Sequence, residues 1–100
     1  MATVTKTLAR TAATTSSTTL YTVPASTTTV VTNILLSNTA GTSSTGTIAF
    51  DGVTAYSNIT IAASSTVSID LKQTLAATKT ITGLASTTAV NFHISGVEII

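Results

Sequence analysis

His93 is the residue best suited to acid–base chemistry, because it is the only histidine in the chain. A neutral imidazole beside a serine could act as a general base if a carboxylate such as Asp51 or Asp70 oriented it. However, His93 stands between Phe92 and Ile94, on the polar side of an alternating segment. That setting predicts a half-exposed strand residue that hydrogen-bonds a neighbour or solvent, and not a catalytic base.

Other groups that could hold a metal ion or a cofactor are few. Asp51, Asp70 and Glu98 are the only carboxylates, their positions lack the spacing of a metal site, and the chain has no cysteine. None of the glycines lies in a strand, glycine-rich turn and helix arrangement followed by lysine, which phosphate-binding loops require. We therefore expect no catalytic residue, metal, cofactor or small-molecule substrate, and predict that the protein is not an enzyme. An oligomer axis could still gather symmetry copies of such residues.

Composition indicates an uncharged, β-rich protein. Of the 100 residues, 26 are threonine and only 7% are charged, against roughly 25% charged residues in an average soluble domain. Threonine is β-branched and suits a pleated strand, and its hydroxyl keeps an exposed face wet without charge. Because a free monomer usually carries more charge for solubility, we expect a homo-oligomer.

The basic residues give no sign of a polyanionic partner. They are scattered along the chain, which has a net charge of +1: Lys6, Arg10, Lys72 and Lys79. This pattern argues against binding to nucleic acid or to an anionic membrane. The N-terminus lacks the apolar run of a signal peptide, and the longest aliphatic run, Ile34–Leu36, is too short to span a bilayer. We expect a protein made and used without secretory export.

Alternating apolar residues and turn signals predict a series of short strands. Asp51-Gly52, between two apolar runs, suits the positive φ angles of a type I′ hairpin turn. Val67–Lys72 alternates strictly and predicts a strand with one buried face. The expected strands are 20–23, 28–38, 47–50, 53–56, 58–62, 67–72, 80–84 and 89–100, with a loop at 38–46 and a helical turn or loop at 73–78.

Two of these strands carry apolar residues on both sides. In the strand 28–38 both parities are apolar, which predicts a central strand covered on its two faces. In the last strand, Phe92 and Ile94 share one parity, whereas Val97 and Ile99 share the other. One inserted residue switches the side that later residues face, so we expect a β-bulge at Gly96.

Roughly seven to eight short strands without helical periodicity predict an all-β fold, an antiparallel β-sandwich of jelly-roll type. The length suits a single domain over residues 1–100. Residues 1–19 are the least patterned, and 11–19 are almost wholly alanine, serine and threonine. We expect this segment to be an extended N-terminal arm or a loosely paired edge strand, which a partner could order.

Several motifs resemble a pattern found in small structural proteins of tailed-phage virions. One is Leu20-Tyr-Thr-Val-Pro-Ala25, followed by Thr29–Ile34 and Ser37–Thr39. The similarity continues through 50–53, 61–66, 69–73 and 90–98, and so covers most of the chain except residues 1–19. The resemblance implies a structural virion protein with a small β-sandwich fold, which phages use in capsid decoration, tail and fibre parts.

Within that group, the favoured function is that of a capsid decoration, or cement, protein. It would form a homo-oligomer, with a trimer favoured, and bind the major capsid protein on the exterior of the virion. The expected interface residues are Lys6, Leu8 and Arg10 of the N-terminal segment, together with Tyr21. The alternative is a tail-associated or fibre module that contacts the host surface. Small, hydroxyl-rich loops favour decoration over host binding.

Overall fold

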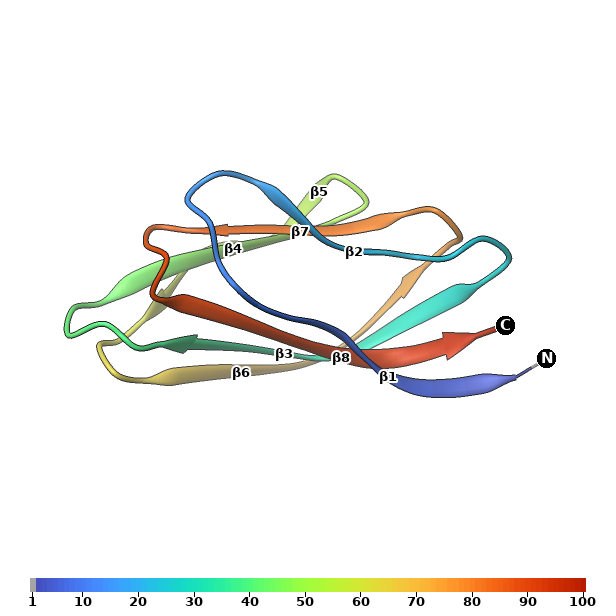
Figure 1. Ribbon diagram of the computed structural model, residues 1–100, viewed down its shortest axis with the longest axis horizontal. Coiled ribbons are helices and arrows are strands. Elements are labelled where there is room, and N and C mark those ends of the chain that lie inside the picture. Colours follow the sequence, from blue (N-terminus) through green and yellow to red (C-terminus); the bar gives the residue numbers. More distant parts are fainter. Residues whose placement is uncertain (1) are drawn as a thin grey trace.

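The computed structural model describes residues 2–100, which form eight β-strands in two four-stranded antiparallel sheets. Figure 1 shows the sheets as two layers packed face to face. The strands are β1 (Thr3–Ala12), β2 (Thr18–Thr22), β3 (Thr28–Asn38), β4 (Ser44–Phe50), β5 (Val53–Ile61), β6 (Thr66–Leu75), β7 (Thr80–Ala85) and β8 (Val90–Ile99). The predicted all-β sandwich is confirmed.

Strand pairing gives the sandwich a jelly-roll topology. One sheet has the strand order β1-β8-β3-β6, and the other has the order β2-β7-β4-β5. Strands therefore pair first with last: β1 with β8, β2 with β7, β3 with β6 and β4 with β5. The chain is in effect one long hairpin, folded at Asp51-Gly52 and rolled so that successive pairs alternate between the sheets.

The turn at the centre of this hairpin has the predicted geometry. Asp51 has a φ of 54° and Gly52 a φ of 76°, both positive as a type I′ turn requires. The strand that follows, β5, is continuous, whereas two separate strands were expected from its sequence. Asn58, with a φ of 51°, interrupts the regular backbone of β5 without ending it, since asparagine tolerates the left-handed region.

Side chains that alternate inward from both sheets form one core. The inward residues of β6 pack against the periphery of this core, where Val67, Ile69 and Leu71 are partly buried. The apolar residues with no exposed surface come from five strands: Val31, Ile34, Leu36, Ile48, Ile61, Ile81, Val90, Phe92 and Ile94.

Strand β8 does not have the predicted bulge at Gly96. Its inward residues alternate without a break from Val90 to Glu98. The inserted residues lie instead in the two neighbouring strands, where the register against β8 shifts at Leu8 in β1 and at Thr32 in β3. The apolar pattern of β8 changes side because its inward positions 96 and 98 carry a glycine and a carboxylate.

Strand β3 is not covered on both faces as expected. The bulge at Thr32 switches its inward parity, so that Val31 before the bulge and Ile34 after it both reach the core. Val30 and Leu35 lie half-buried on the outward face. A bulge, and not a second covering layer, thus accounts for the apolar residues on both parities.

Several boundaries also differ from the expected ones. Strand β6 runs to Leu75, so the helical turn or loop expected from residue 73 is wrong there; pairing with β3, which reaches Thr29↔Leu75, supplies the backbone partners. Strand β4 begins at Ser44, inside the expected loop, and β2 begins at Thr18. Asn38 holds the loop between β3 and β4, since its side-chain amide donates to the carbonyls of Thr42 (2.9 Å) and Ile61 (3.1 Å).

The N-terminal segment lies along the edge of a sheet. Strand β1 pairs with β8 over a register that runs from Thr3↔Ile99 to Ala12↔Asn91. Ala2 and Ile100 extend this ladder through two backbone hydrogen bonds of 2.9 and 2.8 Å. The two ends of the described chain therefore lie side by side, as Figure 1 shows.

Candidate interaction surface

The structure separates the groups from which a catalytic triad could be built. His93 is half-buried on the outward side of β8. Asp51 lies in the turn between β4 and β5, where its carboxylate is 3.8 Å from the ammonium of Lys79. Asp70, on β6, accepts a hydrogen bond of 2.9 Å from the side chain of Asn33. Both carboxylates are thus engaged by partners other than His93.

Two other kinds of functional feature are absent from the part of the chain that the structure describes. Within residues 2–100, no group of three or more His, Cys, Asp or Glu side chains is placed to hold a metal ion. In the same residues, no helix has the length and apolar character needed to cross a membrane. The features that remain are a buried polar network and the outer faces of the two sheets.

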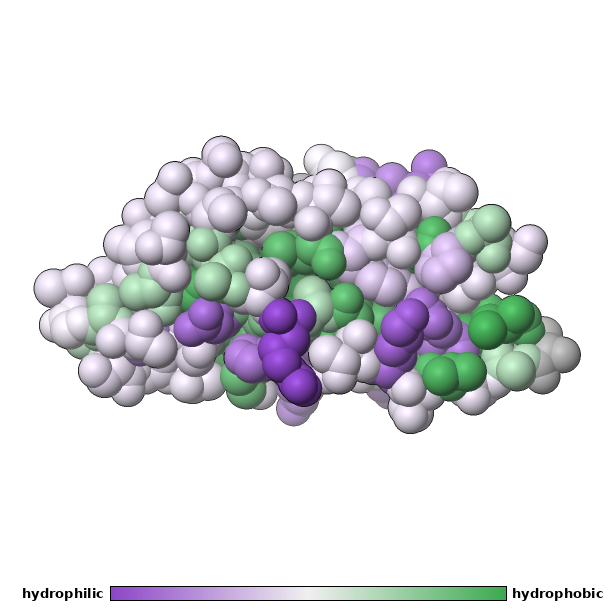
Figure 2. Space-filling model, in the orientation of Figure 1, coloured by the Kyte–Doolittle hydropathy of each residue, from purple (hydrophilic) through white to green (hydrophobic). Residues whose placement is uncertain are grey.

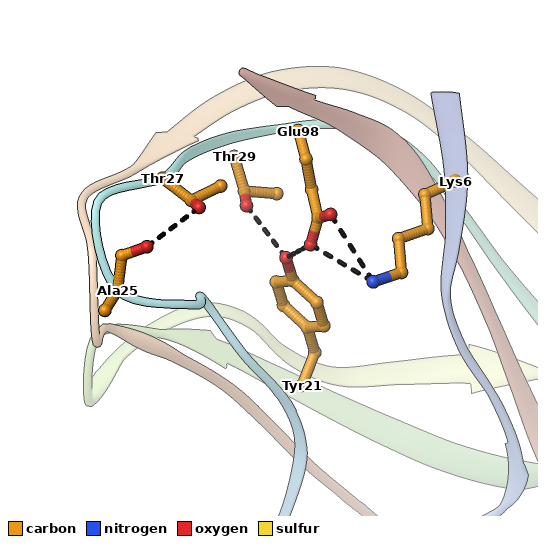
Figure 3. A network of polar contacts seen from close by, with 6 residues as sticks. All are labelled: Lys6, Tyr21, Ala25, Thr27, Thr29 and Glu98. Carbon is orange, nitrogen blue, oxygen red and sulfur yellow. Dashed lines mark hydrogen bonds and ion pairs between the residues drawn. The ribbon is translucent and has the colours of Figure 1, made fainter. Parts of the chain in front are cut away.

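The polar network joins four strands around the carboxylate of Glu98 (Figure 3). Glu98 points inward from β8 and is only 6% exposed. The hydroxyl of Tyr21, from β2, donates a short hydrogen bond to this carboxylate. The ammonium of Lys6, from β1, lies 3.4 Å from both carboxylate oxygens. The hydroxyl of Thr29, from β3, is 2.9 Å from that of Tyr21.

Electrostatics determine which group in this network holds the proton. The hydrogen bond from Tyr21 lowers the pKa of Glu98 below its ordinary value of 4.5; burial opposes this shift and Lys6 adds to it. Burial raises the pKa of Tyr21 above 10.0, and so does its hydrogen bond to Glu98. At neutral pH the carboxylate is therefore ionised and the phenol is neutral. Because the phenol hydrogen points to Glu98, the Thr29 hydroxyl donates to the Tyr21 oxygen.

The lowered pKa of Glu98 makes stability depend on pH. A carboxyl whose pKa is lower in the folded state stabilises the fold above its unfolded pKa, and this contribution disappears as pH falls through the folded pKa. We expect the free energy of unfolding, measured by urea denaturation, to fall as the pH drops below about 4.5. The variant Glu98→Gln should be less stable at pH 7 by about 1–3 kcal/mol and should show a smaller loss in acid.

Asp70→Asn is the matched control for this experiment, since it removes an exposed carboxylate from the same sheet. Glu98→Gln should lose less stability in acid than this variant does. An equally steep acid loss in Glu98→Gln would contradict the role assigned to Glu98.

The four residues expected at an interface fall into different environments. Lys6 and Tyr21 meet in the polar network, although they were not expected to be neighbours. Leu8 is 7% exposed and packs in the core. Arg10 lies exposed on the edge strand β1. In the single chain, therefore, only Lys6 and Arg10 of this set present side-chain surface to a partner.

Charge is distributed unevenly between the two sheets. None of the residues in β2, β7, β4 and β5 is charged, so we call these strands the neutral sheet; β1, β8, β3 and β6 form the charged sheet. In Figure 2 the upper layer is mostly pale, and the deepest purple lies along the lower layer. The charged sheet carries Lys6, Arg10, Asp70, Lys72 and Glu98, while Asp51 and Lys79 lie in turns.

The outward face of the neutral sheet is built from hydroxyl and methyl groups. One row crosses all four strands in register, from Thr19 through Thr82 and Ala49 to Thr54. The centre of this face is hollowed, and the hollow is lined by Ser17, Thr47, Ala49, Gly52, Thr54, Thr82, Gly83 and Leu84. A partner that covers this face has no charge to desolvate in these strands.

The segregation of charge is the feature that was missed from the sequence. Its signal was present, because every expected strand of the neutral sheet lacks a charged residue. Only the strand order shows that these strands are neighbours, since β2, β7, β4 and β5 are interleaved along the chain with strands of the other sheet.

No family model matches the chain, and no curated protein matches it either.

Proposed function

We propose that this protein is a capsid decoration protein of a tailed phage, which binds the exterior of the shell as a homo-oligomer. The observation that carries the proposal is the neutral sheet, a four-stranded surface without a charged residue in a chain that is already poor in charge. The resemblance of several motifs to a pattern in structural virion proteins adds support. A trimer is the favoured oligomer, and the major capsid protein is the favoured partner.

The neutral sheet suits a mechanical function. Threonine hydroxyls can exchange water for hydrogen bonds to a partner, and their methyl groups add apolar contact, so that docking carries no penalty for stripping water from ions. Each such contact is modest. Several copies joined in one oligomer would bind a repeating shell far more tightly than a single copy, because later contacts become intramolecular. No reactive group is needed.

A tail-associated or fibre module is the alternative. The molecule is elongated, with extents of 46 × 21 × 18 Å, which would also suit a rod-like tail part. Electron microscopy of intact virions, with the protein marked by a bound antibody fragment, separates the two. Density over the shell is the expected result, and density restricted to the tail would overturn the decoration proposal in favour of the alternative.

A charge on the neutral sheet should disrupt docking. Thr82 is half-buried on β7, in the middle of this face. Thr82→Lys would bring an unpaired charge into the interface, which costs about 2 kcal/mol or more. That cost corresponds to an affinity for capsids lacking the protein that is weaker by roughly 30-fold or more, measured by co-sedimentation.

Thr74→Lys is the matched control, because Thr74 is exposed on β6 of the charged sheet, opposite Val30. It should bind as the unmodified protein does, and both variants should keep the unmodified melting temperature within a few degrees. Equal binding by Thr82→Lys would rule out the neutral sheet as the docking face.

A further inference from the structure

Strand β1 is attached to the sandwich mainly through its backbone. It lies at the edge of the charged sheet, and of its ten residues only Leu8 and Ala9 are buried. Its neighbour β8, by contrast, buries every second residue along its length. A strand held by a hydrogen-bond ladder and two core side chains has a low local stability compared with the central strands.

The connection that follows β1 is suited to act as a hinge. Figure 1 shows the chain leaving β1 and crossing from one layer to the other before β2 begins. Ala13 and Thr14 anchor the start of this crossing, since the buried Ala13 donates a backbone hydrogen bond to Val90 and Thr14 accepts one from Ala85. The bend at Thr15 and Ser16 is exposed and built from small side chains.

The groove that β1 occupies is specific for this strand. Leu8 covers the backbone at Gly96, where an added Cβ would lie 2.8 Å from its Cδ1 atom. Lys6 supplies the cation that pairs with the buried carboxylate of Glu98. An identical strand from another copy can reproduce both contacts and the whole ladder.

Addition of a further strand outside β1 is less favourable than replacement of β1. Lys6 belongs to the edge strand but points inward, toward Glu98 (Figure 3). Inward-pointing charges on edge strands are a common device against edge-to-edge pairing. Contact between copies along this edge is therefore better made by exchange.

We propose that copies of this protein exchange β1, so that the β1 of one chain pairs with β8 of another and links the subunits of the oligomer. This inference rests on the homo-oligomer in the proposed function and names the element that joins its subunits. Exchange of an identical element is a low-cost route to association, because the contacts already exist within one chain.

Disulfide trapping tests the exchange directly, because the natural chain has no cysteine. Thr5 on β1 lies opposite Val97 on β8, and the Cβ atoms of opposed residues are about 4.5–5.5 Å apart, close to the disulfide range. After mild oxidation, most chains of the double variant Thr5→Cys/Val97→Cys should migrate as covalent oligomers on a denaturing, non-reducing gel. The largest species then gives the number of subunits.

The control is Val30→Cys/Val97→Cys, which joins β8 to the central strand β3 at an opposed pair. This variant should remain a monomer on the same gel, because β3 is not exchanged. Two results would overturn the exchange. One is an intrachain disulfide in both variants, so that both migrate as single chains; the other is the absence of any disulfide between positions 5 and 97. Native mass spectrometry of the unmodified protein separates the two proposals. If the unmodified protein is an oligomer but the Thr5→Cys/Val97→Cys variant forms only intrachain disulfides, strand exchange is refuted and the homo-oligomer stands. If the unmodified protein is a monomer, the homo-oligomer itself is refuted.

Discussion

Phe92→Ala is expected to lower the free energy of unfolding by about 3–5 kcal/mol, the usual cost of removing a fully buried aromatic ring. Phe92 has no exposed surface. Its ring extends from the charged sheet to two glycines of the neutral sheet: an added Cβ would lie 3.8 Å from it at Gly46 and 3.3 Å from it at Gly83. The ring shares the space that these glycines leave open with Leu36 and Leu20, whose side chains would come within 2.6 and 2.8 Å of the same added Cβ atoms. Removal of the ring would leave a cavity among these side chains, between the two sheets.

Urea denaturation at pH 7 measures this loss. A domain of this kind is stable by about 5–15 kcal/mol, so Phe92→Ala could remove much of the total, and Phe92→Leu should show a smaller loss in the same direction. His93→Ala is the matched control, because it changes the adjacent outward residue and should alter stability by at most about 0.5 kcal/mol. A loss below 1 kcal/mol in Phe92→Ala would contradict the packing described.

Gly96→Ala should be the most damaging of the small substitutions, with an expected loss of about 3 kcal/mol. A methyl group at this position would overlap the backbone carbonyl oxygen of Val30 and lie 2.8 Å from Leu8. The backbone of β3 comes this close because the bulge at Thr32 lies beside Gly96. A flexible side chain could move aside, but the carbonyl is held in the strand ladder.

Gly41→Ala is the control for Gly96→Ala, since an added Cβ at Gly41 would meet nothing within 4 Å. At position 41, alanine restricts the unfolded chain more than glycine does. This replacement should therefore leave the free energy of unfolding unchanged or raise it by about 0.4–1 kcal/mol. Thermal unfolding followed by circular dichroism gives both values. Equal melting temperatures for the two variants would mean that β3 can move away from β8.

Local signals in the sequence were sufficient for the fold class and for the central turn. Asp51-Gly52 predicted a type I′ hairpin because its residue types permit positive φ angles, and both angles are positive. Strict alternation in β6 predicted one buried face for the same kind of local reason. These features depend on residues that are adjacent in the chain.

The bulges could not be placed in the same way. The apolar pattern of β8 changes side near Gly96, but the inserted residues are Leu8 and Thr32, in strands that are distant along the chain. A bulge is a property of a strand pair, and periodicity within one strand does not say which partner holds the extra residue. The inward carboxylate of Glu98 adds to the ambiguity, because a charged residue on a core position resembles a surface position in sequence.

The candidate surfaces were only partly predictable. Low charge indicated association, and Lys6 and Tyr21 were singled out, but as contacts with a partner. Their meeting with Glu98 requires the pairing of the first strand with the last, across a separation of 92 residues between Lys6 and Glu98. Such long-range pairs leave no local pattern, so neither the network nor the neutral sheet could be assembled before the strand order was known.

The adjacency of the two chain ends has a mechanical consequence. Ala2 and Ile100 form the first rung of the antiparallel β1-β8 ladder. Tension applied to both ends would therefore unzip this ladder one rung at a time, which resists force far less than shearing many rungs together. If the protein reinforces a shell, as proposed, the load would therefore have to enter through the broad faces of the two sheets and not through Ala2 and Ile100.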